Sequence, residues 1–121
     1  MPQILIVEDN VSLNKVYSLV LQKEGFSVAN AFDGRDGLDL LKSVKPDLIL
    51  LDMIMPHMDG LEFLRRFPFK DHPTTRVIIL SNVNEDKQVN QALKLGAKHY
   101  IIKSDNSPKD LVARLNEILE S

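Results

Sequence analysis

Four short runs of apolar residues, each free of interspersed polar residues, restrict the fold of this chain more than any other feature. They are three or four residues long and rich in Ile, Leu or Val. Unbroken apolar strands of this length are typical of parallel sheets that helices cover on both faces. The sequence therefore predicts buried strands within residues 4–7, 48–51, 77–80 and 100–102.

A fifth segment, residues 26–30, alternates apolar and polar side chains, which favours a strand at a less covered sheet edge. Apolar residues at helical spacing separate the strands. This alternation predicts an α/β fold, in which one domain over residues 1–121 forms a (βα)5 three-layer sandwich with a flavodoxin-like parallel sheet of order 2-1-3-4-5. The first two predicted helices carry the apolar stripes Leu13 to Leu21, ended by Gly25, and Leu38, Leu41 and Val44, ended by Pro46. The third begins at the cap Asp59 and carries Leu61, Leu64 and Phe67, and the fourth carries Val89 to Leu95 and is ended by Gly96. The fifth has the start signal Ser107, Pro108 and Asp110.

The composition disfavours several classes of protein. Seventeen acidic and fifteen basic residues give a net charge of −2, without the basic excess that neutralises nucleic-acid phosphates. The absence of cysteine excludes a disulfide scaffold, a thiolate zinc site and a cysteine nucleophile. No apolar run is long enough to span a membrane, and Met1-Pro2-Gln3 leads into the first strand without a basic signal segment. We therefore expect a cytoplasmic protein that binds neither nucleic acid directly nor a membrane.

Ionisable and hydroxyl side chains follow the predicted central strands. Glu8 and Asp9 come after the first strand, Asp52 after the third, Ser81 after the fourth and Lys103 after the fifth. Parallel strands of an open sheet bind ligands at their carboxyl ends. Three carboxylates there would repel one another unless a cation joined them, and Mg²⁺ prefers oxygen ligands. A metal, a lysine, a hydroxyl and a nucleophilic carboxylate together predict a phosphoryl-transfer site.

Taken singly, most of these residues have an ordinary structural explanation. Asp9 or Ser81 could cap a helix, and Lys103 could be a solvated loop lysine. Asp52 differs because it lies between four apolar residues and the apolar residues 53–55, where an unpaired carboxylate is costly. The joint pattern at matching strand ends favours a functional site.

The same residues resemble the receiver domains of bacterial two-component response regulators, the CheY-like phosphoacceptor domains, over the whole chain. Residues 6–10, Ile-Val-Glu-Asp-Asn, resemble the opening acidic pair of that family. Residues 51–60, Leu-Asp-Met-Ile-Met-Pro-His-Met-Asp-Gly, are similar to its phosphoacceptor segment and carry the most specific signal. Residues 80–81 and 100–103 match the two later motifs in order and spacing.

The resemblance implies that Asp52 accepts a phosphoryl group from the phosphohistidine of a histidine kinase, from a phosphotransfer protein, or from a small donor such as acetyl phosphate. Asp9, Asp52 and the backbone carbonyl of Ile54 would bind Mg²⁺ directly, and Glu8 mainly through metal-bound water. Lys103 would pair with the acceptor or its phosphate. The protein would then be a signalling switch rather than an enzyme, apart from its own phosphorylation and slow autodephosphorylation.

The resemblance also implies a switch in which Ser81 turns toward the phosphoryl oxygen and Tyr100 rotates inward. The face formed by the fourth helix, fifth strand and fifth helix would change, and its affinity for partners with it. That face would bind a downstream protein target, or a fused output domain that this sequence does not contain, and it is a candidate dimer surface. By the same analogy, Asn14, Lys15 and Ser18 mark a helix face that could dock a kinase.

Two positions depart from the pattern of the family, and two more bear on the lifetime of the phosphorylated state. Ser104 replaces the proline that commonly follows the lysine through a cis peptide bond, and a non-proline cis bond costs about 3 kcal/mol, which leaves the geometry of this loop open. Asn82 replaces a small residue, so it restricts access of the phosphodonor or hydrogen-bonds the phosphoryl group. Ile54 and Val83 cannot hold a water for attack on the phosphoaspartate, so we expect slow self-dephosphorylation.

Other interpretations remain open beside this one. A pseudo-receiver would use the same fold as a protein-binding module without phosphorylation, an interpretation that Asn82 and Ser104 permit. A phosphatase with an aspartyl-phosphate intermediate usually has a second aspartate two residues after the nucleophile, and here that position is Ile54. A flavodoxin would need a phosphate-binding loop after the first strand, where Glu8 and Asp9 would repel phosphate.

Overall fold

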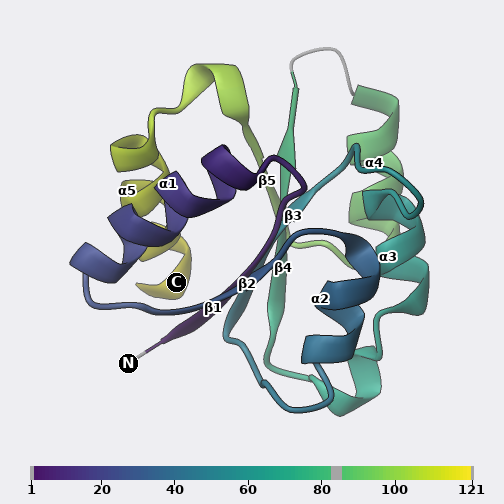
Figure 1. The fold of residues 1–121 in the computed structure, drawn as a ribbon. Helices are drawn as coiled ribbons and strands as arrows, with labels where there is room; N and C mark the ends of the chain where they lie inside the picture. Colours follow the sequence, from purple (N-terminus) through teal and green to yellow (C-terminus); the bar gives the residue numbers. More distant parts are fainter. Residues whose placement is uncertain (1, 83–85, 121) are drawn as a thin grey trace.

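The chain folds into a parallel sheet of five strands between two layers of helices (Figure 1), as seen in a computed structural model that describes residues 2–82 and 86–120. The strand order is β2-β1-β3-β4-β5, which confirms the predicted α/β fold and the edge position of the alternating strand. The strands are β1 (Gln3–Val7), β2 (Ser27–Ala31), β3 (Leu48–Asp52), β4 (Arg76–Ser81) and β5 (His99–Ile102).

Helices α1 and α5 cover one face of the sheet, and α2, α3 and α4 cover the other (Figure 1). Among the described residues, no helix has both the length and the apolar character needed to cross a membrane. The helices are α1 (Val11–Lys23), α2 (Gly34–Leu40), α3 (Gly60–Arg66), α4 (Asp86–Leu95) and α5 (Pro108–Glu120), with single 3-10 turns η1 (Phe69–Asp71) and η2 (Lys103–Asp105).

Local signals start and stop these helices as predicted. The Asp59 side chain accepts the hydrogen bond of a backbone N–H in the first turn of α3. Ser107 and Asp110 bond each other's backbone N–H groups, at 3.2 Å to Ser107 Oγ and 3.0 Å to Asp110 Oδ2, as a reciprocal cap of α5. Gly25 and Gly96 follow α1 and α4 with φ of 96° and 121°, a conformation that glycine adopts without steric cost.

Two helices are shorter than their apolar stripes. Leu41 is the C-terminal cap of α2 and stays buried, whereas Val44 lies beyond the helix. Phe67 is the cap of α3 and takes an extended conformation, because Pro68 after it disfavours a helical backbone. An apolar stripe reports which side chains are buried, and Leu41 and Phe67 show that burial continues past the last residue of the regular helix.

Alternate residues of the central strands enter two separate apolar clusters, one on each face of the sheet. In β1, β3 and β4 these apolar residues are essentially inaccessible to solvent, which confirms the prediction of strands buried on both faces. The same prediction is wrong for β5, because β5 lies at an edge of the sheet and Tyr100 is 46% exposed. Burial on both sides fixes the register of the strands, because a shift by one residue would exchange the two faces. In β1 and β3, residues Leu5, Val7, Ile49 and Leu51 face α2–α4, and residues Ile4, Ile6, Leu48 and Leu50 face α1 and α5.

Candidate functional site

The pairing of the strands brings the predicted site residues to one edge of the sheet. The last residue of β1 pairs with Leu51, so Glu8 follows β1 beside the end of β3. Asp52 and Ser81 are the last residues of β3 and β4 rather than the residues after them, and Lys103 follows β5. Each side chain therefore starts from the carboxyl end of a strand whose position the buried core holds.

Three carboxylates converge at this edge. Glu8, Asp9 and Asp52 each offer a carboxylate oxygen, and these oxygens lie within 4.8 Å of one another. Glu8 and Asp52 are 1% and 5% exposed, while Asp9 is half-buried. Asp9 does not cap α1, because Asn10 does so by accepting the Leu13 N–H at 3.0 Å.

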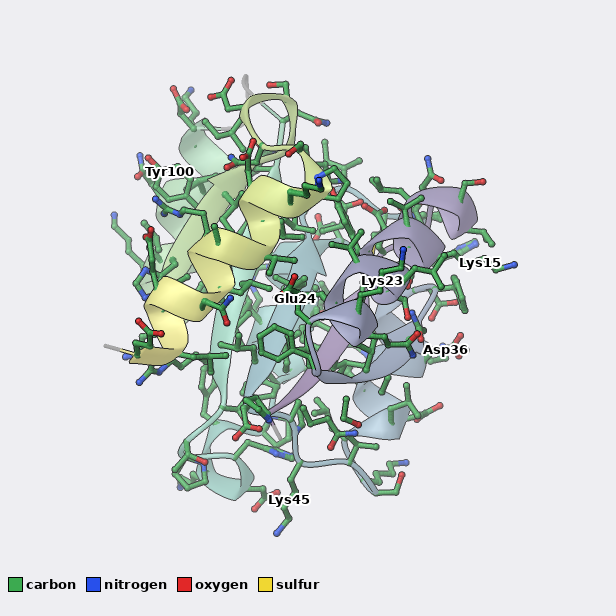
Figure 2. The ribbon with its side chains drawn as sticks, turned by 90° about the vertical axis from the view of Figure 1, so that its left-hand side faces the viewer. Lys15, Lys23, Glu24, Asp36, Lys45 and Tyr100 are labelled. Atoms are coloured by element: carbon green, nitrogen blue, oxygen red, sulfur yellow. The ribbon has the colours of Figure 1, made fainter. Side chains whose placement is uncertain are left out.

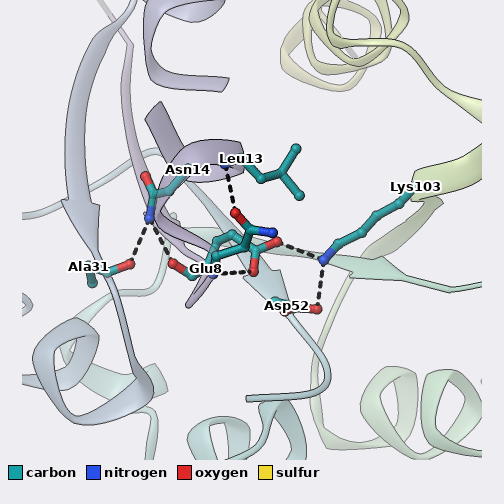
Figure 3. A network of polar contacts seen from close by, with 7 residues as sticks. Glu8, Leu13, Asn14, Ala31, Asp52 and Lys103 are labelled. Carbon is teal, nitrogen blue, oxygen red and sulfur yellow. Dashed lines mark hydrogen bonds and ion pairs between the residues drawn. The ribbon is translucent and has the colours of Figure 1, made fainter. Parts of the chain in front are cut away.

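Lys103 lies between two of these carboxylates (Figure 3). Its Nζ is 2.6 Å from Glu8 Oε1 and 3.1 Å from Asp52 Oδ1, and only 18% of its side chain is exposed. It is thus a buried ion-pair partner rather than a solvated loop lysine. Three carboxylates against this one ammonium leave an excess of negative charge in a poorly solvated place, which favours the binding of a cation.

The pKa values of Asp52, Glu8 and Lys103 do not all shift in the same direction. Burial raises the pKa of Asp52 to about 7, and the neighbouring Glu8 adds to the rise while Lys103 opposes it. Burial also acts to raise the pKa of Glu8, but hydrogen bonds with Asp52 and Lys103 outweigh it and hold that pKa below its usual value. Burial acts to lower the pKa of Lys103, and the two carboxylates more than compensate, so the ammonium stays charged. Asp52 is the member that gains and loses a proton near neutrality.

A glycine holds the backbone of Asp52 against the start of α3. The Gly60 N–H donates to the Met53 carbonyl at 2.8 Å. A Cβ added at Gly60 would lie 2.9 Å from the Asp52 carbonyl oxygen and from Met53 Cα, closer than a side chain tolerates. The glycine in the segment 51–60 is therefore required by close backbone approach.

The other predicted site residues lie around this group. Ser81 is 1% exposed, and the described part of α4 begins five residues after it, at Asp86. Asn82 is exposed at the end of β4. The side chains of Ile54 and Tyr100 are on the surface, 57% and 46% exposed, and Tyr100 stands at the outer edge beside α5 (Figure 2).

The loop after Lys103 has an ordinary trans backbone. Residues 103–105 form the 3-10 turn η2, and no cis peptide bond occurs in residues 2–82 and 86–120. The Asn106 amide donates to the Ile102 carbonyl at 3.0 Å and closes the turn. Ser104 is thus accommodated without the cis bond of the family pattern. Val83, the second residue behind the expected slow dephosphorylation, lies outside the described residues.

The predicted kinase-docking face is wrong in two of its three residues. Asn14 is fully buried and Ser18 is 8% exposed, so only Lys15 faces outward (Figure 2). Buried positions 14, 17, 18 and 21 form one stripe of α1. Apolar periodicity alone misses Asn14 because it discounts polar residues on an inner face. Helical spacing alone, regardless of polarity, places Asn14 on the same face of α1 as Tyr17 and Leu21.

The chain belongs to the response regulator receiver domain family, whose model matches residues 4–116. It is 37% identical over 119 residues to the transcriptional regulatory protein AfsQ1 of Streptomyces coelicolor, covering 98% of this chain and 52% of that protein. It is 35% identical over 121 residues to the chemotaxis protein CheY of Treponema pallidum, covering 98% and 83%. A CheY-like receiver domain structure from Methanospirillum hungatei superposes with a TM-score of 0.90 at 28% identity, covering 99% and 94%.

Family membership sets the general function. Receiver domains are signalling modules of two-component systems, and they imply phosphorylation-dependent signalling with histidine kinases and output domains. They bind Mg²⁺ at an acidic pocket, and the acidic cluster of this chain is Glu8, Asp9 and Asp52. The chain spans about half the length of AfsQ1, the first of these relatives.

Proposed function

We propose that residues 1–121 act as one receiver domain in which Asp52 accepts a phosphoryl group, and that this group controls which proteins the domain binds. The convergence of Asp52 with Glu8, Asp9 and Lys103 at the carboxyl end of the sheet carries the proposal. The buried apolar strands hold these groups in place before any donor arrives, so little ordering has to accompany the reaction.

The transfer is a displacement at phosphorus. A carboxylate oxygen of Asp52 forms the new P–O bond, and the P–N bond of a phosphohistidine or the P–O bond of acetyl phosphate breaks. The electron pair of that bond leaves with the imidazole or the acetate. Lys103 Nζ, 3.1 Å from Asp52 Oδ1, neutralises charge on the phosphoryl oxygens, and Ser81 donates a hydrogen bond to one of them. Asp52 must be ionised to attack, and without a bound cation its pKa is about 7.

The cluster fits Mg²⁺ because its ligand atoms are oxygens and its carboxylates outnumber its ammonium group. Glu8, Asp9, Asp52 and the backbone carbonyl of Ile54 would hold the ion. The ion supplies positive charge that favours the ionised form of Asp52 and neutralises the phosphoryl oxygens. Asn82, exposed next to this edge, controls access of the donor or bonds the phosphoryl group.

The output follows from the α4-β5-α5 face. Tyr100 borders an open groove of about 390 Å³ whose lining includes Leu93 of α4, His99 of β5 and Arg114 of α5. Movement of Ser81 toward the phosphoryl group and of Tyr100 into the domain would reshape this groove. A downstream protein, a fused output domain or a second copy of the domain would then bind one state better, which is the condition for a switch.

The phosphorylated state should be long-lived. The Ile54 side chain is apolar and cannot position a water for attack on the phosphoaspartate. We expect phosphate release with a half-life of minutes or longer. A time course of phosphate release from the isolated phosphorylated protein measures this half-life. Release within seconds would reject this part of the proposal.

The central experiment incubates the protein with Mg²⁺ and acetyl phosphate and measures the intact mass. One phosphoryl increment is expected on the parent and none on Asp52→Asn. Asp59→Asn is the matched control, because Asp59 caps α3 in the neighbouring loop and asparagine can also cap a helix. An adduct on Asp52→Asn would contradict the assignment, no adduct on the parent would favour a pseudo-receiver, and continuous phosphate release would favour a phosphatase.

A further inference from the structure

A buried asparagine ties the acidic end of β1 to the neighbouring strand. Asn14, in the first turns of α1, is 0% exposed. Its Nδ2 donates to the backbone carbonyl of Glu8 at 3.0 Å and to that of Ala31 at 2.9 Å (Figure 3). Its Oδ1 accepts a hydrogen bond from Asn30 Nδ2 at 2.6 Å. Both amide hydrogens and the amide oxygen are thus used.

These bonds extend the β1·β2 ladder by one residue. Val7 pairs with Ala31, and the Glu8 N–H still donates to the Ala31 carbonyl at 3.1 Å. Past this point the chain of β1 turns into α1. A longer parallel strand would offer a backbone N–H to the Glu8 carbonyl, and the Asn14 side chain supplies that donor instead. The peptide groups on both sides of the Glu8 Cα are therefore fixed.

The acidic side chains start from this fixed backbone. Glu8 Oε1 meets Lys103 at 2.6 Å, and Glu8 Oε2 accepts the Asn10 N–H at 3.2 Å. Asn10 in turn caps α1, the helix that carries Asn14. The turn of residues 8–10 is thus held through the Glu8 side chain by Lys103 and through the Glu8 backbone by Asn14.

We propose that Asn14 is a positioning residue for the acidic cluster: its amide holds the turn of residues 8–10 so that the carboxylates of Glu8 and Asp9 converge with Asp52. The inference rests on the proposed function of that cluster as the Mg²⁺ site. Leucine has a similar volume but would leave the buried Glu8 carbonyl without its donor. The turn would then relax toward other partners, and the three carboxylates would no longer be placed together in advance.

The test follows backbone amide signals of ¹⁵N-labelled protein by NMR, first without metal and then during a titration with Mg²⁺ at constant ionic strength. In Asn14→Leu we expect shifted signals for residues 8–10 before Mg²⁺ is added. The Mg²⁺ dissociation constant should rise about tenfold, the usual size of an effect from a residue that orients metal ligands. Asn14→Ala serves as a second variant if the leucine variant does not fold.

Two further variants separate positioning from general destabilisation. Leu21→Ala empties a fully buried position on the same helix, away from the turn, so it should lower the unfolding midpoint and leave Mg²⁺ affinity unchanged. Asn30→Ser removes only the bond to Asn14 Oδ1, and the two bonds to backbone carbonyls remain, so its effect on Mg²⁺ affinity should be much smaller.

Unchanged signals for residues 8–10 together with parent-like Mg²⁺ affinity in folded Asn14→Leu or Asn14→Ala would overturn the inference. Failure of the parent itself to bind Mg²⁺ would instead overturn the proposed function of the cluster. In that case the metal-free signals of residues 8–10 still decide whether Asn14 holds the turn.

Discussion

Polar groups are accommodated in opposite ways at the amino ends and at the carboxyl ends of the central strands. At the amino ends, Asp47 is exposed and accepts the Gln3 N–H at 2.7 Å, and its own N–H donates to the Gln3 carbonyl at 2.8 Å. The Thr75 hydroxyl donates to the Pro46 carbonyl at 2.6 Å. Backbone and hydroxyl groups are matched here, and the charged acceptor Asp47 stays in contact with water.

At the carboxyl ends, charges are buried and face one another. Glu8 and Asp52 share the ammonium of Lys103, and Asp9 adds a third carboxylate. The raised pKa of Asp52 is the measure of this mismatch. One end of the sheet therefore contributes stability through matched polar groups, whereas the buried charges at the other end can respond to protons, cations and phosphoryl groups.

The largest expected effect is a loss of stability from a substitution in the core at the amino end of the sheet. Leu48, the first residue of β3, is fully buried, and Leu48→Ala should lower the free energy of unfolding by about 3 kcal/mol because it leaves a cavity. Urea denaturation measures this loss. Mg²⁺ affinity of the folded variant should equal that of the parent, and a parallel loss of affinity would show that the two ends are not separable.

A change of opposite sign is expected at the carboxyl end. The pKa of Asp52 is about 7 in the folded protein against 3.8 ordinarily, so the folded state holds a proton that the unfolded chain has lost between these values. Stability from this group is therefore present at low pH and lost as the pH rises from about 4 to about 7. Asp52→Asn should be more stable than the parent by a few kcal/mol at pH 8 and little different at pH 4.

Urea denaturation in the presence of a chelator, at several pH values, tests this second prediction. The lowered pKa of Glu8 acts in the opposite direction and at more acidic pH, so it does not mask the effect. Equal stability of Asp52→Asn and the parent at pH 8 would mean that the Asp52 carboxylate is better solvated than its burial indicates.

An intermediate effect is expected where the start of α3 packs against the carboxyl end of β3. Gly60→Ala places a methyl group 2.9 Å from the backbone of Asp52 and Met53 and should cost about 1 to 2 kcal/mol of stability while it weakens Mg²⁺ binding. Gly34→Ala is the matched control, because its closest contact is the flexible Met58 side chain. An identical response of both variants to Mg²⁺ would contradict the role given to Gly60.

The smallest effect should come from the matched polar groups. Thr75→Val removes the hydroxyl donor of the Pro46 carbonyl and should cost about 1 kcal/mol. Phosphorylation by acetyl phosphate should proceed at the parental rate. A slower rate would show that the amino end communicates with the carboxyl end, against the comparison drawn above.

The architecture could be predicted from local patterns in the amino-acid sequence. Local patterns predicted the individual elements: the unbroken apolar runs and the single alternating segment predicted strands, and the caps at Asp59 and Ser107 predicted helix starts. The alternating segment also predicted the order of the strands. The apolar stripes ran on to Val44 and Phe67, whereas α2 ends at Leu40 and α3 at Arg66, because apolar periodicity does not mark the last residue of a regular helix.

The way in which the carboxyl-end residues meet depends on long-range contacts of the folded chain. It placed Lys103 between Glu8 and Asp52, residues far apart in the chain, and buried Asn14 behind them. It also required a glycine at position 60. Periodicity and capping depend on neighbours within a few residues, whereas these contacts depend on register and on which helix crosses which strand end. Charge burial follows from those non-local contacts, so the pKa of Asp52 belongs to the fold rather than to the sequence around it.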